Sequence, residues 1–163
     1  MAEKDIADYY EQHGQLVYRY LLRLCGDDSL AAELTQETFY QAIRTVDRYR
    51  GDCKPSVWLC QIGRHCWYKH LQKERHTKGS VEPDESLVSD APSPEDAAIA
   101  NDDKMRIYMR MRQLRPDVRE VLYLRILGEL SFAEIGKIIG RTENWARVTY
   151  FRGKKELQED DEI

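Results

Sequence analysis

The feature that most constrains the fold is a Pro-, Ser- and acid-rich stretch in the middle of the chain. Residues 77–103 read TKGSVEPDESLVSDAPSPEDAAIANDD and hold eight Asp or Glu against one Lys. Few of their side chains are large and apolar, so they cannot bury enough surface to offset the entropy of ordering. We therefore predict a flexible acidic linker at 77–103 that divides the 163 residues into two domains, 1–76 and 104–163. Each domain is small and has only a modest core.

Both halves have the apolar repeat of amphipathic helices, with large side chains recurring at threes and fours. In the first half this pattern predicts helices over 5–24, 28–48 and 56–75, with Asp28 or Ser29 as the N-cap of the second. In the second half it predicts helices at about 104–113, 117–127, 131–139 and 142–158. The expected fold class is all-α, a three- to four-helix bundle followed by a four-helix domain.

The segment SFAEIGKIIGRTENWARVTYFRGKK, residues 131–155, predicts a helix-turn-helix. Ser131 and Glu134 have capping-box spacing, Gly140 permits a tight turn, and Thr142 can cap the second helix. That helix would turn one face inward, with Ala146, Tyr150, Gly153 and Leu157. Its other side and rim carry Arg141, Asn144, Trp145, Arg147, Val148, Thr149, Arg152, Lys154 and Lys155. This pattern suits a helix in a DNA major groove, although a helical hairpin with a solvated basic face would share it.

Positive charge is concentrated in parts of a chain whose net charge is −4. Residues 51–76 hold five Lys or Arg against two acids, and the basic residues of 137–155 form a second concentration. The helix expected at 56–75 combines cations with Trp67 and Tyr68, as surfaces that stack single-stranded bases and neutralise phosphates do. We assign Trp58 to packing and leave Trp67 open between core and base platform.

The cysteines and histidines do not form an evident metal or catalytic site. Cys25, Cys53, Cys60 and Cys66 lack paired C-x-x-C spacing, so free thiols are expected. Zinc held by Cys60, His65 and Cys66 is the weaker alternative, because Cys60 and Cys66 lie well apart around a helix. The chain has no P-loop, no H-E-x-x-H motif and no nucleophile elbow, so we expect no enzyme and no cofactor.

No apolar run is long enough to cross a bilayer, and the N-terminus does not read as a secretion leader. We therefore expect a cytoplasmic protein without direct membrane insertion.

Three blocks of the sequence resemble the extracytoplasmic-function group of bacterial sigma-70-type sigma factors. AAELTQETFYQAIRTVDRYRG resembles the region 2 helix that grips core RNA polymerase, and KPSVWLCQIGRHCWYKHLQKERH resembles the segment that opens and reads the promoter −10 element. LRPDVREVLYLRILGELSFAEIGKIIGRTENWARVTYFRGKKEL resembles region 4, which reads the −35 element. The resemblance implies a sigma factor that binds core polymerase, directs it to promoters and helps to melt the −10 element.

The resemblance also implies roles for individual residues. Those on or beside the surface that docks the β′ clamp coiled coil are Glu33, Gln36, Glu37, Phe39 and Arg44. Those at the −10 element are Asp52, Cys53, Lys54 and Ser56 in a loop, with Arg64, His65, Tyr68, Lys69 and Lys73 behind it. Those at the −35 element are Arg141, Thr142, Asn144, Trp145, Arg147, Val148, Thr149, Arg152 and Lys155.

The partners implied are promoter DNA, core RNA polymerase through its β′ clamp and β flap, and an anti-sigma factor, which is often membrane-anchored in this group. Two other classes use parts of the same pattern. A repressor or activator would use the helix-turn-helix without polymerase, usually as a dimer on two half-sites. A protein that sequesters a sigma factor would not need two basic helices. Promoter-specific transcription starts by core polymerase would distinguish a sigma factor from both of these alternatives.

Overall fold

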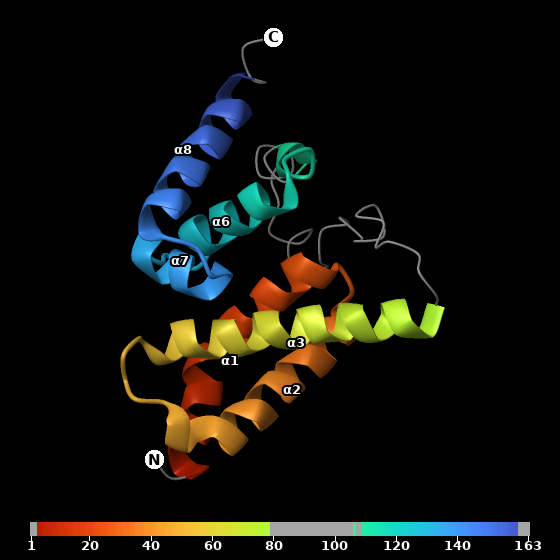
Figure 1. Ribbon diagram of the computed structural model, residues 1–163, viewed down its shortest axis with the longest axis vertical. Coiled ribbons are helices and arrows are strands. Elements are labelled where there is room, and N and C mark those ends of the chain that lie inside the picture. The colour runs from red at the N-terminus through yellow and green to blue at the C-terminus, as the bar shows by residue number, and fades with distance from the viewer. Residues whose placement is uncertain (1–2, 79–105, 107–108, 160–163) are drawn as a thin grey trace. The chain divides into compact units, whose positions relative to one another are not determined.

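The computed structural model describes residues 3–78, 106 and 109–159 (Figure 1). Their regular structure is helical and they contain no strand, which confirms the all-α prediction. The chain divides into two units, Met1–Ser89 and Asp90–Ile163. The division falls inside the predicted linker, of which only Thr77 and Lys78 are described, as the end of a helix. The flexibility of the remaining linker residues stays a prediction.

The first unit is a bundle of three long helices. These are α1 (Glu3–Cys25), α2 (Asp28–Thr45) and α3 (Pro55–Lys78), and a 3-10 turn, η1 (Val46–Arg48), follows α2. Each α-helix packs against the other two. Val17, Leu21 and Leu59 are completely buried at the centre, and their burial removes from water the apolar stripes seen in the sequence.

Two threonines of α2 also face this core. The Thr35 hydroxyl donates to the Ala31 carbonyl at 2.7 Å, and the Thr38 hydroxyl donates to the Leu34 carbonyl at 2.6 Å. Both hydroxyls are thereby satisfied within their own helix, so their burial leaves no unpaired donor.

The N-cap of α2 is Asp27, and the expectation of Asp28 or Ser29 is wrong by one or two residues. The Asp27 backbone is extended, and its carboxylate accepts from the Leu30 amide at 3.2 Å. Asp28 is already helical, where its charge lies favourably near the positive end of the helix dipole. Asp27, Asp28 and Ser29 are all residue types that can cap a helix, so residue type alone does not choose among them.

The second unit contains α6 (Pro116–Ile126), α7 (Phe132–Ile139) and α8 (Glu143–Glu159). Pro116 occupies the first turn of α6, where a proline costs no helix hydrogen bond. The core joins Met111, Leu114, Val118 and Leu122, with Tyr150 and Leu157 packed against it. Gly153 lets α8 approach α6 closely, because a Cβ there would lie 2.6 Å from Val118 Cγ1. The helix expected over 104–113 lies partly outside the described residues.

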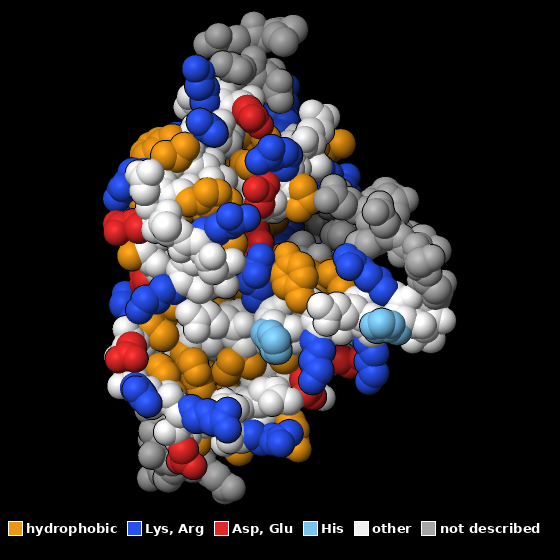
Figure 2. Space-filling model, in the orientation of Figure 1, with side chains coloured by type: hydrophobic (Ala, Val, Ile, Leu, Met, Phe, Trp, Pro, Cys, Tyr) orange, Lys and Arg blue, Asp and Glu red, His pale blue; other side chains and the backbone are white. Residues whose placement is uncertain are grey.

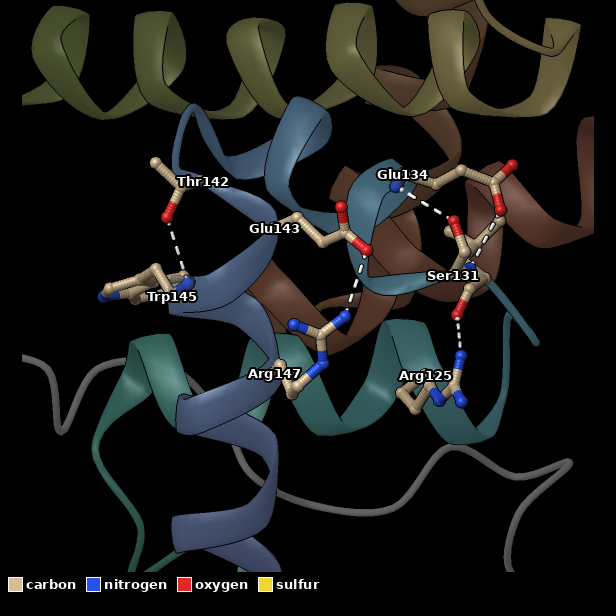
Figure 3. Close-up of polar contacts among 8 residues, drawn as sticks. Arg125, Ser131, Glu134, Thr142, Glu143, Trp145 and Arg147 are labelled. Carbon is tan, nitrogen blue, oxygen red and sulfur yellow. Dashed lines mark hydrogen bonds and ion pairs between the residues drawn. The ribbon is translucent and has the colours of Figure 1, made fainter.

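The turn between α7 and α8 is built from the local signals seen in the sequence. Ser131 and Glu134 form the predicted capping box at the start of α7. Gly140 adopts a φ of 82°, a left-handed conformation that glycine reaches without penalty, and ends the helix. The Thr142 hydroxyl oxygen then accepts from the Trp145 amide at 3.0 Å and caps α8 (Figure 3). The helix-turn-helix prediction is confirmed in its elements.

Among the helices that the structure describes, none combines the length and the hydropathy that crossing a bilayer requires.

Candidate nucleic-acid interface

The outer face of α8 and the turn before it present most of the residues predicted for the −35 element. Those exposed are Arg141, Thr142, Asn144, Arg147, Val148, Arg152 and Lys155. Trp145 is half-buried, and the Arg141 guanidinium lies 5.4 Å from the centroid of its ring. A row of cations on one side of a helix, with an amide among them, is suited to phosphates and base edges.

Thr149 does not belong to this exposed face. It is buried in the unit with 9% of its surface accessible, and it lies one turn from the fully buried Ala146. A residue three positions after an inward one is carried back to nearly the same side of the helix. Its assignment to the DNA-facing side was therefore wrong, and the inward face is wider than predicted.

Arg147, in the N-terminal half of α8, has two partners that orient its side chain. Its Nη2 donates to Glu143 Oε1 at 3.1 Å, within one turn of helix (Figure 3). Its guanidinium also lies 5.6 Å from the centroid of the Phe132 ring at the start of α7. Both partners restrict the rotamers of a long side chain, so a phosphate or a base would meet a cation that is already oriented.

Arg125 is a residue that the sequence analysis did not single out. It comes from the last turn of α6, yet its guanidinium lies 4.2 Å from the centroid of the same Phe132 ring. Its Nη1 donates to the Leu130 carbonyl at 2.9 Å (Figure 3). Arg125 and Arg147 thus contact one aromatic ring from two helices. No local spacing links α6 to α8, so only the folded chain reveals the pair.

In the first unit, a stacked aromatic pair closes the loop predicted for the −10 element. The Tyr49 and Trp58 rings lie 4.6 Å apart at an interplanar angle of 24°. The Tyr49 hydroxyl donates to the Cys53 carbonyl, and burial is the main reason that the pKa of Tyr49 is raised. Asp52 and Lys54 are exposed at the loop, whereas Cys53 and Ser56 are partly buried. Trp58 is half-buried and packs against Tyr49, which agrees with its assignment to packing.

Behind this loop, α3 exposes Lys, Arg and His side chains beside hydrophobic ones (Figure 2). The Arg64 guanidinium lies 4.6 Å from the centroid of the ring of Tyr68, a residue that is 42% exposed. His65, Lys69 and Lys73 are exposed, as is Tyr68. A cation held against an exposed ring is a surface on which an unpaired base can stack.

Trp67 belongs to the core and not to this basic face. It is 8% exposed, and its ring stacks with that of His70 at a centroid distance of 6.0 Å. The open alternative for Trp67 is therefore decided in favour of packing.

The outer face of α2 carries the residues predicted to dock on polymerase. Glu33, Gln36, Glu37 and Arg44 are exposed on it. Phe39 instead is 6% exposed and packs edge-on against the Tyr10 ring at 5.0 Å. It can support that face from beneath but offers little surface to a partner. Tyr40 and Ile43, at 54% and 45% exposed, supply the apolar area that was expected from Phe39.

The cysteine thiols are free, and the three residues considered as zinc ligands, Cys60, His65 and Cys66, do not come together. Cys60 and Cys66 are buried whereas His65 is exposed. Within 3–78 and the described part of the second unit, no three His, Cys, Asp or Glu side chains are grouped as ligands for a metal ion. Burial raises the pKa of Cys60 to about 12, so this thiol stays protonated and unreactive at neutral pH.

A three-helix bundle with a basic aromatic face, followed by a helix-turn-helix with an exposed cationic helix, is typical of a DNA-binding protein. Residues 9–77 match the model of Sigma-70 region 2, and residues 104–157 match that of Sigma-70, region 4. The chain belongs to the sigma-70 family, in its extracytoplasmic-function group.

Known sigma factors are similar along nearly the whole chain. The RNA polymerase sigma factor CarQ of Myxococcus xanthus is 28% identical over 160 residues, covering 97% of this chain and 90% of the relative. The ECF RNA polymerase sigma factor SigX of Bacillus subtilis is 26% identical over 159 residues, covering 94% and 82%. The sigma factor RpoE of Bartonella quintana, solved in complex with the anti-sigma factor NepR, shares the fold with a TM-score of 0.76, 19% identity and 98% of each chain covered.

The protein therefore acts in transcription initiation. It binds core RNA polymerase and directs it to specific promoters. Sigma factors are transcription factors and not enzymes.

Proposed function

We propose that the two units divide one promoter between them, with α3 and its preceding loop at the −10 element and α8 at the −35 element. The observation that carries the proposal is the exposed cationic side of α8. The opposite side of this helix packs closely against α6 at Gly153. Rigid attachment of a reading helix fixes which side chains reach the groove. The assignment of 1–76 to region 2 and of 104–163 to region 4 is part of this proposal.

At the −10 element, the proposal gives the loop at 50–54 the task of holding an extruded base of the non-template strand. Arg64 and Tyr68 would supply stacking, and Lys69 and Lys73 would neutralise phosphates. Unstacking a base costs a few kcal/mol, which stacking on an aromatic ring, about 1–3 kcal/mol per base, can offset. Promoter opening would then run on binding energy without ATP.

On the polymerase side, we assign the exposed side of α2 to the β′ clamp coiled coil and the second unit to the β flap. Glu33, Gln36, Glu37 and Arg44 would supply polar contacts, and Tyr40 with Ile43 would supply apolar area. An interface core of aromatic and aliphatic side chains with a polar rim is the usual composition of such contacts.

An anti-sigma factor is the proposed regulator of this cytoplasmic protein, and it could hold the protein at the inner face of the membrane. The support is that the Bartonella quintana sigma factor, which has the same fold, was solved with an anti-sigma factor. Affinity capture of the tagged chain from resting cells would then recover a second partner besides polymerase. Recovery of polymerase alone would contradict the regulator but not the promoter assignment.

Transcription from a genomic fragment library with core polymerase, with and without the full chain, tests the proposal. We expect starts at a defined set of promoters only when the chain is present, with −10 thymines that become reactive to permanganate. Arg152→Ala would weaken binding by about 1–3 kcal/mol if its side chain reaches a base edge. Binding to a palindrome without any promoter-specific start would contradict the proposal and favour a repressor.

A further inference from the structure

Two apolar side chains lie in the middle of the cationic face of α8. Val148 is 38% exposed and Phe151 is 54% exposed. They are three residues apart, so they are neighbours on the same side of the helix. Large apolar side chains that adjoin at the surface commonly mark a contact with another molecule.

The rotamer of Phe151 is restricted by contacts with two other aromatic rings. Its ring lies 5.2 Å from that of Tyr150 in an edge-on arrangement and 6.1 Å from that of Phe132. Phe132 in turn is contacted by the Arg125 and Arg147 guanidinium groups. Aromatic contacts of this kind hold ring orientation, so Phe151 presents a fixed apolar surface next to oriented cations.

The polar and cationic side chains around Val148 and Phe151 indicate what these two residues contact. Asn144 and Arg152 lie one turn before and one turn after Val148, and Lys155 lies one turn after Phe151; all three are exposed. Figure 2 shows hydrophobic side chains interspersed with Lys and Arg over the second unit. An apolar strip bordered by cations complements a groove whose floor has apolar groups and whose walls are phosphates. The major groove of DNA has this composition, because the C5-methyl group of thymine projects into it.

We propose that Val148 and Phe151 contact thymine C5-methyl groups, so that this chain selects thymine at positions of its −35 element. The inference rests on the proposed placement of α8 at that element and names the base chemistry that it reads. Adenine and guanine lack the methyl group, and cytosine shows a donor beside a bare C5. Hydrogen bonds from Asn144 and Arg152 would then read the neighbouring base edges.

The experiment uses holoenzyme reconstituted from the full chain and core polymerase. A promoter selected from a randomised duplex library is resynthesised with each −35 thymine in turn replaced by deoxyuridine, which lacks only the methyl group. We expect one or two positions at which deoxyuridine weakens binding by about fourfold, the factor that loss of one buried methyl-sized group gives.

The variants assign this effect to residues. Phe151→Ala and Val148→Ala should bind the thymine promoter more weakly and lose the distinction between thymine and deoxyuridine. Alanine suits a helix, but Phe151→Ala also loses the ring contacts with Tyr150 and Phe132, so thermal unfolding is measured to verify that both variants are folded at the temperature of the binding assay. Arg152→Ala is the matched control, which should weaken binding to both duplexes equally and keep their ratio.

Three results would overturn the inference. The first is equal binding of thymine and deoxyuridine at every −35 position by the parent holoenzyme. The second is an unchanged ratio in both alanine variants. The third is weaker assembly of Phe151→Ala with core polymerase at an unchanged ratio, which would make the strip a protein contact. A holoenzyme that selects no sequence at all would instead contradict the proposed function.

Discussion

The rings of Tyr49 and Trp58 stack 4.6 Å apart and join the two ends of the loop between η1 and α3. The Tyr49 hydroxyl reaches across that loop to the Cys53 carbonyl. The Trp58 amide donates to the Lys54 carbonyl at 3.1 Å and ties the loop to the first turn of α3. The loop assigned to base capture is therefore shaped before DNA arrives.

Tyr49→Phe keeps this stack and removes only the hydroxyl donor. One net hydrogen bond contributes about 0.5–1.5 kcal/mol, so we expect promoter opening to fall by about two- to tenfold. Permanganate reactivity of −10 thymines with the variant holoenzyme measures the opening. Binding to the −35 element serves as the internal control, because the second unit is unchanged. Normal opening would show that the loop does not need this bond.

The cap of α2 gives a direct comparison between neighbouring residues. Asp27→Ala removes the carboxylate that accepts from the Leu30 amide, and we expect a loss of about 1 kcal/mol in the free energy of unfolding. Ser29→Ala is the control, since Ser29 lies inside the exposed first turn and should change stability by less than about 0.5 kcal/mol. Urea unfolding measures both. A larger effect at Ser29 would mean that the cap is misassigned.

Gly153→Ala tests the close approach of α8 to α6. Alanine alone would favour the helix by about 1 kcal/mol, but its Cβ would lie 2.6 Å from Val118 Cγ1 and 3.3 Å from Leu122 Cδ1. Overpacking of this kind costs about 1–3 kcal/mol, so we expect net destabilisation or at best no gain. Thermal unfolding checks this result. Lys154→Ala on the exposed side is the control, and clear stabilisation by Gly153→Ala would contradict the packing.

The face of α2 can be tested without damage to the core. Glu33→Ala with Gln36→Ala alters exposed residues, so we expect weaker binding to core polymerase and an unchanged melting temperature. Phe39→Ala removes a buried ring and should lower stability by about 3–5 kcal/mol, which makes it a poor probe of docking. Competition for core polymerase and thermal unfolding are measured together. Full core affinity in the double variant would refute the assigned face.

Cys60 makes the free energy of unfolding depend on pH in the alkaline range. Burial raises the pKa of its thiol from 9.0 to about 12, so the folded protein holds this proton more tightly than the unfolded chain does. The resulting stabilisation is complete below pH 9 and is lost as pH rises from 9 towards 12, by up to about 1.4 kcal/mol per pH unit.

Urea unfolding at about pH 8 and about pH 10.5 measures this slope. Cys60→Ala should show a shallower decline, with the remainder owed to other groups such as Cys25 and Cys66, whose pKa values burial also raises. Equal declines in the parent and the variant would exclude Cys60 as a source.

Helix positions and the helix-turn-helix were predictable because their signals are local. The Ser131–Glu134 capping box, the left-handed Gly140 and the Thr142 cap each act within a few residues. The basic character of α3 and α8 was equally readable, because charge is a property of the residues themselves. The family followed from the same stretches of sequence.

What only the tertiary structure decided is which residues at the edge of a helix face lie inside. Phe39, Trp67 and Thr149 are all buried, although a helical wheel allows either side for them. A neighbouring helix covers more of its partner than the apolar stripe indicates, and its crossing angle determines how much more. The meeting of Arg125 and Arg147 at Phe132 is likewise tertiary, since it depends on how α6, α7 and α8 pack and on no spacing along the chain.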